Sequence, residues 1–184
     1  LRKPLGYGVG IGLGFWLLAS LSLNLYEQGT RLPDITLRNA AGETVQLADY
    51  QGGPLVINLW ATWCPPCRRE MPVLENAQQQ RPDLTFLFVN QGESMQSVST
   101  FLATQGLSLT NILFDGGGRL GQAVGSMALP TTLFYNAEGR LLASHLGELS
   151  DASLARALEN FGSPDAALQA PTSRKLPCPG SATC

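Results

Sequence analysis

The sequence contains few charged residues, a single histidine and no run of basic or acidic side chains. Asp, Glu, Lys and Arg make up 14% of the 184 residues, and the formal net charge is −2. Without a basic stripe, the chain has no electrostatic basis for binding nucleic acid. The one histidine, His145, is far along the chain from any cysteine. We interpret it as a packed or surface side chain, because no catalytic triad partner accompanies it.

Phosphate-binding loops are also absent from the sequence. No Gly-x-Gly-x-x-Gly segment follows a predicted strand, so the glycines near the start of the chain do not form a dinucleotide loop. Gly116-Gly117-Gly118 lacks the Lys and Ser/Thr of a nucleotide phosphate loop and is interpreted as a turn.

Charge is missing altogether from residues 5–26, which contain no Asp, Glu, Lys, Arg or His. This length is sufficient to cross a bilayer core, which needs about 20 residues. Arg2 and Lys3 precede the run, and positive charge is usually kept on the cytoplasmic side. We therefore expect residues 1–26 to be a single transmembrane anchor that places the rest of the chain outside the cytoplasm. A cleaved signal peptide is the alternative, although Ala19-Ser20-Leu21 is a poor cleavage site.

Strand and helix patterns alternate through residues 27–162, which we expect to be one domain. Apolar runs predict strands, and amphipathic spacing predicts helices. The predicted strands are 55–60, 84–89, 111–114, 131–135 and 140–145, and the predicted helices are 64–80, 94–104, a short one near 120, and 150–161. Such an alternation ending in a hairpin predicts an α/β fold with a mixed central sheet and helices on both faces.

Residues 163–184 are rich in Pro, Ser and Ala, and we expect a flexible tail. The tail contains two of the four cysteines, Cys178 and Cys184. In an oxidising compartment these two can pair with each other. The alternative is that the tail reaches the redox site and exchanges disulfides with Cys64.

The other two cysteines form the segment Cys64-Pro65-Pro66-Cys67, between a predicted buried strand and a predicted helix. A Cys-x-x-Cys pair alone is ambiguous between redox chemistry and zinc binding. Its position favours redox chemistry, because Cys64 would cap the helix and Pro65 would occupy the first helical position. Free amides and the helix dipole would then stabilise a thiolate. Cys64 is therefore the predicted nucleophile, and Cys67 the residue that resolves the mixed disulfide.

Glu70 follows Cys67 by three residues and is predicted to lie on the same face of the helix. Met71 and Leu74 place an apolar stripe beside it, so its carboxylate is expected to point toward the core. There it could accept the proton of Cys67, and its negative charge would raise the pKa of a thiol. The alternative is a solvated glutamate that offsets Arg68 and Arg69.

The segment from Trp60 to Pro72 resembles the active site of the TlpA/ResA-like family of thioredoxin-fold proteins, which includes the cytochrome c maturation thioredoxins. The likeness extends from about residue 32 to residue 161. It implies a thioredoxin-like three-layer fold and a cis peptide bond before Pro130, which would face the cysteines. Leu129 would offer backbone groups to the substrate. Asn58 and Glu70 also match the family, but the segment 128–131 departs from the cytochrome maturation members, which argues against a dedicated haem-protein role.

The resemblance also implies a function, a protein-disulfide reductase outside the cytoplasm that is recharged by a membrane electron donor. We expect Cys64, Cys67 and Glu70 to be catalytic, and Trp63, Pro65, Leu129 and Pro130 to contact substrate. The redox-active disulfide itself would replace any cofactor. The expected location is the bacterial inner membrane, with the catalytic domain in the periplasm. The alternatives are a dithiol oxidase, a redox-linked holdase and a zinc-binding module.

Overall fold

A computed structural model of the chain describes residues 31–126, 128–159 and 161. The strands are β1 (Thr36–Asn39), β2 (Thr44–Gln46), β3 (Leu55–Trp60), β4 (Thr85–Gln91), β5 (Ile112–Asp115), β6 (Thr131–Tyr135) and β7 (Leu141–Leu146). The helices are α2 (Pro65–Gln80), α3 (Met95–Gln105), α4 (Arg119–Ala123), α5 (Asp151–Glu159) and the short 3-10 helix η1 (Leu47–Tyr50).

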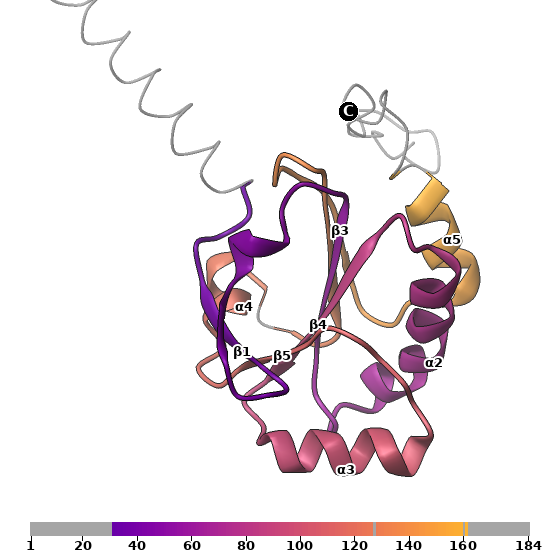
Figure 1. Cartoon of the computed structure of the whole chain (residues 1–184). Coiled ribbons are helices and arrows are strands. Elements are labelled where there is room, and N and C mark those ends of the chain that lie inside the picture. Colours follow the sequence, from indigo (N-terminus) through magenta and orange to yellow (C-terminus); the bar gives the residue numbers. More distant parts are fainter. Residues whose placement is uncertain (1–30, 127, 160, 162–184) are drawn as a thin grey trace, which may run out of the picture.

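Within the described residues, seven strands form one sheet in the order β2-β1-β5-β4-β3-β6-β7 (Figure 1). β3, β4 and β5 are parallel to one another, whereas β1, β2, β6 and β7 join by antiparallel pairing. The predicted α/β fold with a mixed sheet is therefore confirmed. The predicted bounds of β3 and β6 are also correct to the residue.

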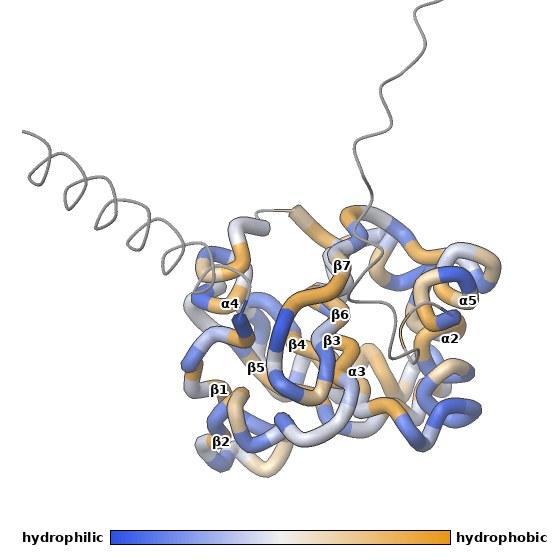
Figure 2. The backbone as a smooth tube through the Cα atoms, turned by 90° about the horizontal axis from the view of Figure 1, so that it is seen from above, coloured by the Kyte–Doolittle hydropathy of each residue, from blue (hydrophilic) through white to orange (hydrophobic). Residues whose placement is uncertain are grey.

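β3 lies in the interior of the sheet, between β4 and β6, and all six of its residues are buried. Its alternate side chains enter two separate cores. One core lies between the sheet and α2, α3 and α5, and the other lies between the sheet and α4 with η1. Figure 2 shows the apolar strands in the centre, with α2 and α5 on one side and α4 on the other. This burial on both faces explains why β3 is a continuous apolar run.

α3 is predicted over residues 94–104 and is observed one residue later at each end. Ser94 caps its start, where the Ser94 hydroxyl accepts a hydrogen bond from the amide of Ser97 at 3.1 Å. Gly106 ends it in the left-handed conformation, with φ 66°.

The hairpin of β1 and β2 was not predicted from the sequence. These strands have only four and three residues, and Leu37 is their one fully buried side chain. A pattern that alternates every two residues cannot be recognised over so short a length. The turn between them depends on Asn39, whose side-chain oxygen accepts hydrogen bonds from the amides of Ala41 and Glu43.

The predicted anchor 1–26 and the predicted tail 163–184, with Cys178 and Cys184, lie outside the described residues. Among the residues that are described, no helix combines the length and apolar character needed to cross a membrane. The anchor, the tail and the domain boundaries at 27 and 162 therefore stay predictions.

Candidate active site

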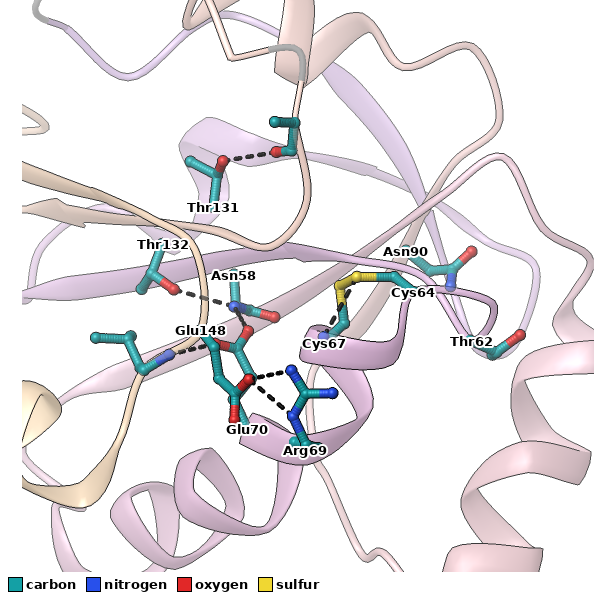
Figure 3. The surroundings of a disulfide bond; sticks show 12 residues. Asn58, Thr62, Cys64, Cys67, Arg69, Glu70, Asn90, Thr131, Thr132 and Glu148 are labelled. Carbon is teal, nitrogen blue, oxygen red and sulfur yellow. Dashed lines mark hydrogen bonds and ion pairs between the residues drawn. A yellow bond between two sulfur atoms is a disulfide. The ribbon is translucent and has the colours of Figure 1, made fainter.

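Cys64 and Cys67 are joined by a disulfide where β3 gives way to α2 (Figure 3). Cys64 caps the helix with an extended backbone, and Pro65 occupies the first helical position, as predicted. Because Pro65 and Pro66 have no amide hydrogen, the first free amide of the helix belongs to Cys67. That amide donates a hydrogen bond to Cys64 Sγ at 3.3 Å. The helix start thus presents a hydrogen-bond donor to the sulfur predicted to be the nucleophile, which favours its thiolate.

The two cysteines differ in their access to solvent. Cys64 retains 3% of its surface, whereas Cys67 is completely buried. A substrate disulfide can therefore approach only through Cys64, while Cys67 can attack only a partner already bound to its neighbour. This arrangement is consistent with the predicted division of roles between nucleophile and resolving cysteine.

Glu70 is completely buried one turn after Cys67 on α2, so the alternative of a solvated glutamate is wrong. Its Oε1 accepts a hydrogen bond from Asn58 Nδ2 at 2.8 Å, and its Oε2 accepts one from the amide of Leu149 at 2.8 Å. Burial is the main effect on this carboxyl and raises its pKa from 4.5 to about 7, against the lowering effect of the two hydrogen bonds. Glu70 can therefore bind or release a proton near neutral pH.

Asn58 connects this carboxyl to the middle of the sheet. It is almost completely buried on β3, directly opposite Thr132 on β6. Its Nδ2 also donates a hydrogen bond to Thr132 Oγ1 at 3.0 Å. The sequence singled out Asn58 through the family resemblance, but it gave no indication that Thr132 and Leu149 would complete the surroundings of Glu70.

Two of the residues predicted to contact substrate, Trp63 and Leu129, line a small cleft close to the start of α2. Trp63 is 67% exposed, and Pro65 is also exposed. The Leu129–Pro130 bond is cis, as the family resemblance implies, and Pro130 itself is buried. Pairing of Leu59 with Thr131 brings this segment to the end of β3. A cleft of about 230 Å³ is lined by Leu59, Trp63, Gln91, Gly118, Gly121, Gln122, Ser126 and Leu129.

Glu93, which sequence reasoning missed, holds the loop that precedes the disulfide. Its carboxylate accepts hydrogen bonds from both the amide and the hydroxyl of Thr62, two residues before Cys64. It also accepts one from Asn90 Nδ2 at 2.7 Å. The carboxyl ends of the parallel strands β3 and β4 meet at one edge of the sheet, which is why residues following each strand are neighbours here. That topology was the only feature that could have identified Glu93 in advance.

An exposed ion pair lies on the outer side of the buried carboxyl. Arg69 donates two hydrogen bonds to Glu148 Oε2, at 2.8 and 2.5 Å, and so joins α2 to the segment before α5. Such a surface pair contributes little to stability. The charge of Glu148 nevertheless raises the pKa of Glu70.

A Cys-x-x-Cys pair can also contribute ligands to a zinc ion. In residues 31–161, as far as the structure describes them, no group of three or more His, Cys, Asp or Glu side chains is arranged to hold a metal ion. His145 lies on β7 as a partly buried side chain, and its Nε2 is 3.4 Å from the backbone oxygen of Glu148.

Comparisons with known proteins agree with this geometry. The sequence matches the Redoxin family over residues 27–158. It is 30% identical to the thiol-disulfide oxidoreductase ResA of Halalkalibacterium halodurans, over 78% of this chain and 82% of that protein. ResA of Bacillus subtilis is 28% identical over 84% of this chain and 92% of its own length. A thioredoxin-family thiol:disulfide interchange protein from Chlorobium tepidum has a similar structure, with a TM-score of 0.62, 25% identity and coverage of 72% of this chain and 95% of that one.

The family match covers every described residue except Glu159 and Phe161, and it includes the disulfide at the start of α2. The predicted TlpA/ResA-like family is thereby confirmed, together with the thioredoxin-like fold. The chain belongs to the Redoxin family and is a thiol–disulfide oxidoreductase of the ResA type.

Proposed function

We propose that this oxidoreductase is a protein-disulfide reductase, anchored in the bacterial inner membrane by residues 1–26, with its catalytic domain in the periplasm or otherwise outside the cytoplasm. The observation that carries the reducing direction is the burial of Glu70 one turn from Cys67. Strongly oxidising relatives stabilise a cysteine thiolate and thereby their reduced form. A buried carboxylate opposes a second negative charge nearby, so Glu70 disfavours the thiolate of Cys67, one turn before it, and thereby favours a reducing potential.

The reaction begins from the dithiol. The Cys64 thiolate attacks one sulfur of a substrate disulfide, and the other substrate sulfur leaves as a thiolate. Cys67 then loses its proton to the Glu70 carboxylate and attacks Cys64 Sγ. The Cys64–substrate bond breaks, and the second substrate sulfur leaves as a thiolate. Two electrons have passed to the substrate, and the Cys64–Cys67 disulfide of the structure is the oxidised product.

Substrate docks at the cleft beside the disulfide. The exposed ring of Trp63 supplies apolar surface, Pro65 lies next to the nucleophile, and Leu129 with Pro130 offers backbone groups. The disulfide needs no other cofactor, and a membrane thiol oxidoreductase returns it to the dithiol. The partners are therefore disulfide-bonded proteins on one side of the cycle and an electron donor in the membrane on the other.

The direction of electron transfer between this protein and its substrates is tested by measuring the reduction potential of the full-length protein. A value near that of thioredoxin, about −270 mV, is expected, whereas a value near that of DsbA, about −120 mV, would assign the dithiol oxidase instead.

Turnover of a protein disulfide should disappear in Cys64→Ser. A Cys64→Ser variant that still protects unfolded proteins at the wild-type level would favour the holdase, and bound zinc in purified protein would favour the metal-binding module.

The location is tested with a membrane-impermeant maleimide on intact cells. In a variant with Cys67, Cys178 and Cys184 all replaced by Ser, Cys64 is the single thiol of the chain. We expect this protein to sediment with membranes and to react with the probe without lysis. Labelling that requires lysis, or recovery in the soluble fraction, would refute the anchored, exported location.

Mixed disulfides that accumulate in Cys67→Ser cells would identify the substrates.

A further inference from the structure

The carbonyl oxygen of the Asn58 side chain is buried without a hydrogen-bond partner among the described residues. Only 1% of the residue is exposed, so bulk water does not reach this oxygen. Buried polar atoms are almost always hydrogen-bonded, and each exception calls for a physical reason. This unpaired acceptor belongs to the same side chain that donates to Glu70.

The orientation of the amide group follows from its partners. Asn58 Nδ2 lies 2.8 Å from Glu70 Oε1 and 3.0 Å from Thr132 Oγ1. A carboxylate only accepts hydrogen bonds, so reversing the amide would place two acceptors against each other. With Glu70 ionised, Asn58 Oδ1 must therefore point away from the carboxylate.

The unpaired oxygen points into the layer that contains the disulfide. Side chains alternate along a strand, so Asn58 shares a face with Val56 and Trp60. Both of these pack in the core that also contains Cys67. Figure 3 shows the Asn58 oxygen directed to the side on which the two cysteines lie, with Glu70 on its nitrogen side.

We propose that Asn58 Oδ1 accepts a hydrogen bond from the thiol of Cys67 when the disulfide is reduced, and that Asn58 is a positioning residue for the proton transfer to Glu70. The inference rests on the proposed function, since it concerns the dithiol that the reductase uses. In the disulfide, Cys67 Sγ carries no hydrogen. Reduction by the electron donor adds two electrons and two protons, and the proton on Cys67 becomes a donor for the oxygen that lacks one.

A single amide would then contact both partners of the proton transfer. Its oxygen would hold the Cys67 S–H, and its nitrogen would hold the carboxylate that receives the proton. The titratable groups around this layer are Cys64, which caps α2, and Cys67 and Glu70 on α2, with Glu148 acting on Glu70 from the segment before α5. Asn58 cannot itself ionise, so its effect is to orient the two groups that do.

The test is the infrared S–H stretch of Cys67, because a hydrogen-bonded thiol absorbs at lower frequency than a free one. The parent protein is the full chain with Cys64, Cys178 and Cys184 replaced by Ser, which leaves Cys67 as the only thiol. We expect a band below the free-thiol frequency. Adding Asn58→Leu should return the Cys67 band to the free-thiol frequency. Adding Thr132→Val removes the hydroxyl that accepts from Asn58 Nδ2 and should leave the band at its lower frequency.

A free-thiol band in the parent would overturn the proposal, as would a low band that persists in Asn58→Leu. The first result is also expected if a water bridges Asn58 Oδ1 to Trp60 Nε1, the other buried polar atom without a partner among the described residues. If Asn58→Leu does not fold, the side-chain carbonyl ¹³C resonance of Asn58 decides. It should shift on reduction of the wild-type protein, and an unchanged resonance would refute the hydrogen bond. None of these measurements requires turnover. A result that refutes the hydrogen bond is therefore distinct from a result that refutes the reductase assignment.

Discussion

At Glu70, burial and hydrogen bonding act on one carboxyl in opposite directions, and burial is the larger effect. The residue has a pKa of 4.5 without these surroundings and about 7 with them. Below the lower value the group is neutral whether the chain is folded or unfolded, so it affects stability little. Between the two values, the folded protein binds the proton more tightly than the unfolded chain. Raising the pH through this window therefore destabilises the fold.

We predict that Glu70→Gln removes this loss of stability. The wild-type oxidised protein should lose up to roughly 3 kcal/mol between pH 4.5 and pH 7 from this group. The variant should show a correspondingly flatter dependence of unfolding free energy on pH, measured by urea denaturation. Glu138→Gln, at an exposed carboxylate in the turn between β6 and β7, is the matched control and should retain the wild-type slope. Equal slopes in wild type and Glu70→Gln would contradict the raised pKa.

The sequence located the residues of the site that lie close together in the chain. Cys64, Cys67 and Glu70 occupy one short segment, where the proline positions and the helical spacing predict their arrangement. Glu93, Thr132 and Leu149 could not be predicted, because they reach this segment through strand pairing and loop packing from distant positions. No local pattern encodes which distant polar groups will satisfy a buried carboxyl.

Among the elements, predictability follows length and burial. β3 and α2 have long apolar patterns and were predicted with nearly correct bounds, whereas the short strands β1 and β2 were missed. β4 extends two residues beyond its predicted end, because Asn90 and Gln91 continue the pairing with β5. Asn90 is polar but buried, so its position inside the strand depends on its neighbours rather than on its own hydrophobicity.

The cap of α3 provides a test at the level of one element. Gly106 has φ 66°, and no other atom lies near the position of an added Cβ. Gly106→Ala should therefore destabilise the fold by about 1 kcal/mol through backbone strain alone. Gly53 has equally open surroundings but no left-handed φ, so Gly53→Ala should be neutral or slightly stabilising. Urea denaturation of the two variants measures the difference, and equal stabilities would show that the cap conformation is not needed.

At the scale of the whole molecule, the order of the strands was the least predictable feature. The hairpin of β6 and β7 follows from a local turn, but nothing local places β1 between β2 and β5. The two cores on either side of the sheet are instead completed by segments from both ends of the described chain. Leu32 contributes to one core and Phe161 to the other.

Phe161 lies just after α5 and packs edge-on against Phe134, with ring centroids 5.5 Å apart. It is 6% exposed, so it closes the core beneath α5. We predict that Phe161→Ala lowers the unfolding free energy by roughly 3 kcal/mol, through lost burial and an unfilled cavity. Leu146→Ala is the control, because that side chain is 67% exposed and should change stability by less than about 0.5 kcal/mol. Calorimetry that finds no difference between them would refute the role of Phe161.

The hydrogen bond between Asn58 and Thr132 has a consequence for how the two central strands find their alignment. A slip of one residue between β3 and β6 would turn the Thr132 hydroxyl to the opposite face of the sheet. Asn58 would then lose one acceptor inside an apolar layer, and the cis-proline segment would move away from the end of β3. The Asn58–Thr132 hydrogen bond therefore destabilises misaligned pairings of β3 with β6. The same strand alignment that gives the native sheet also assembles the surroundings of Glu70.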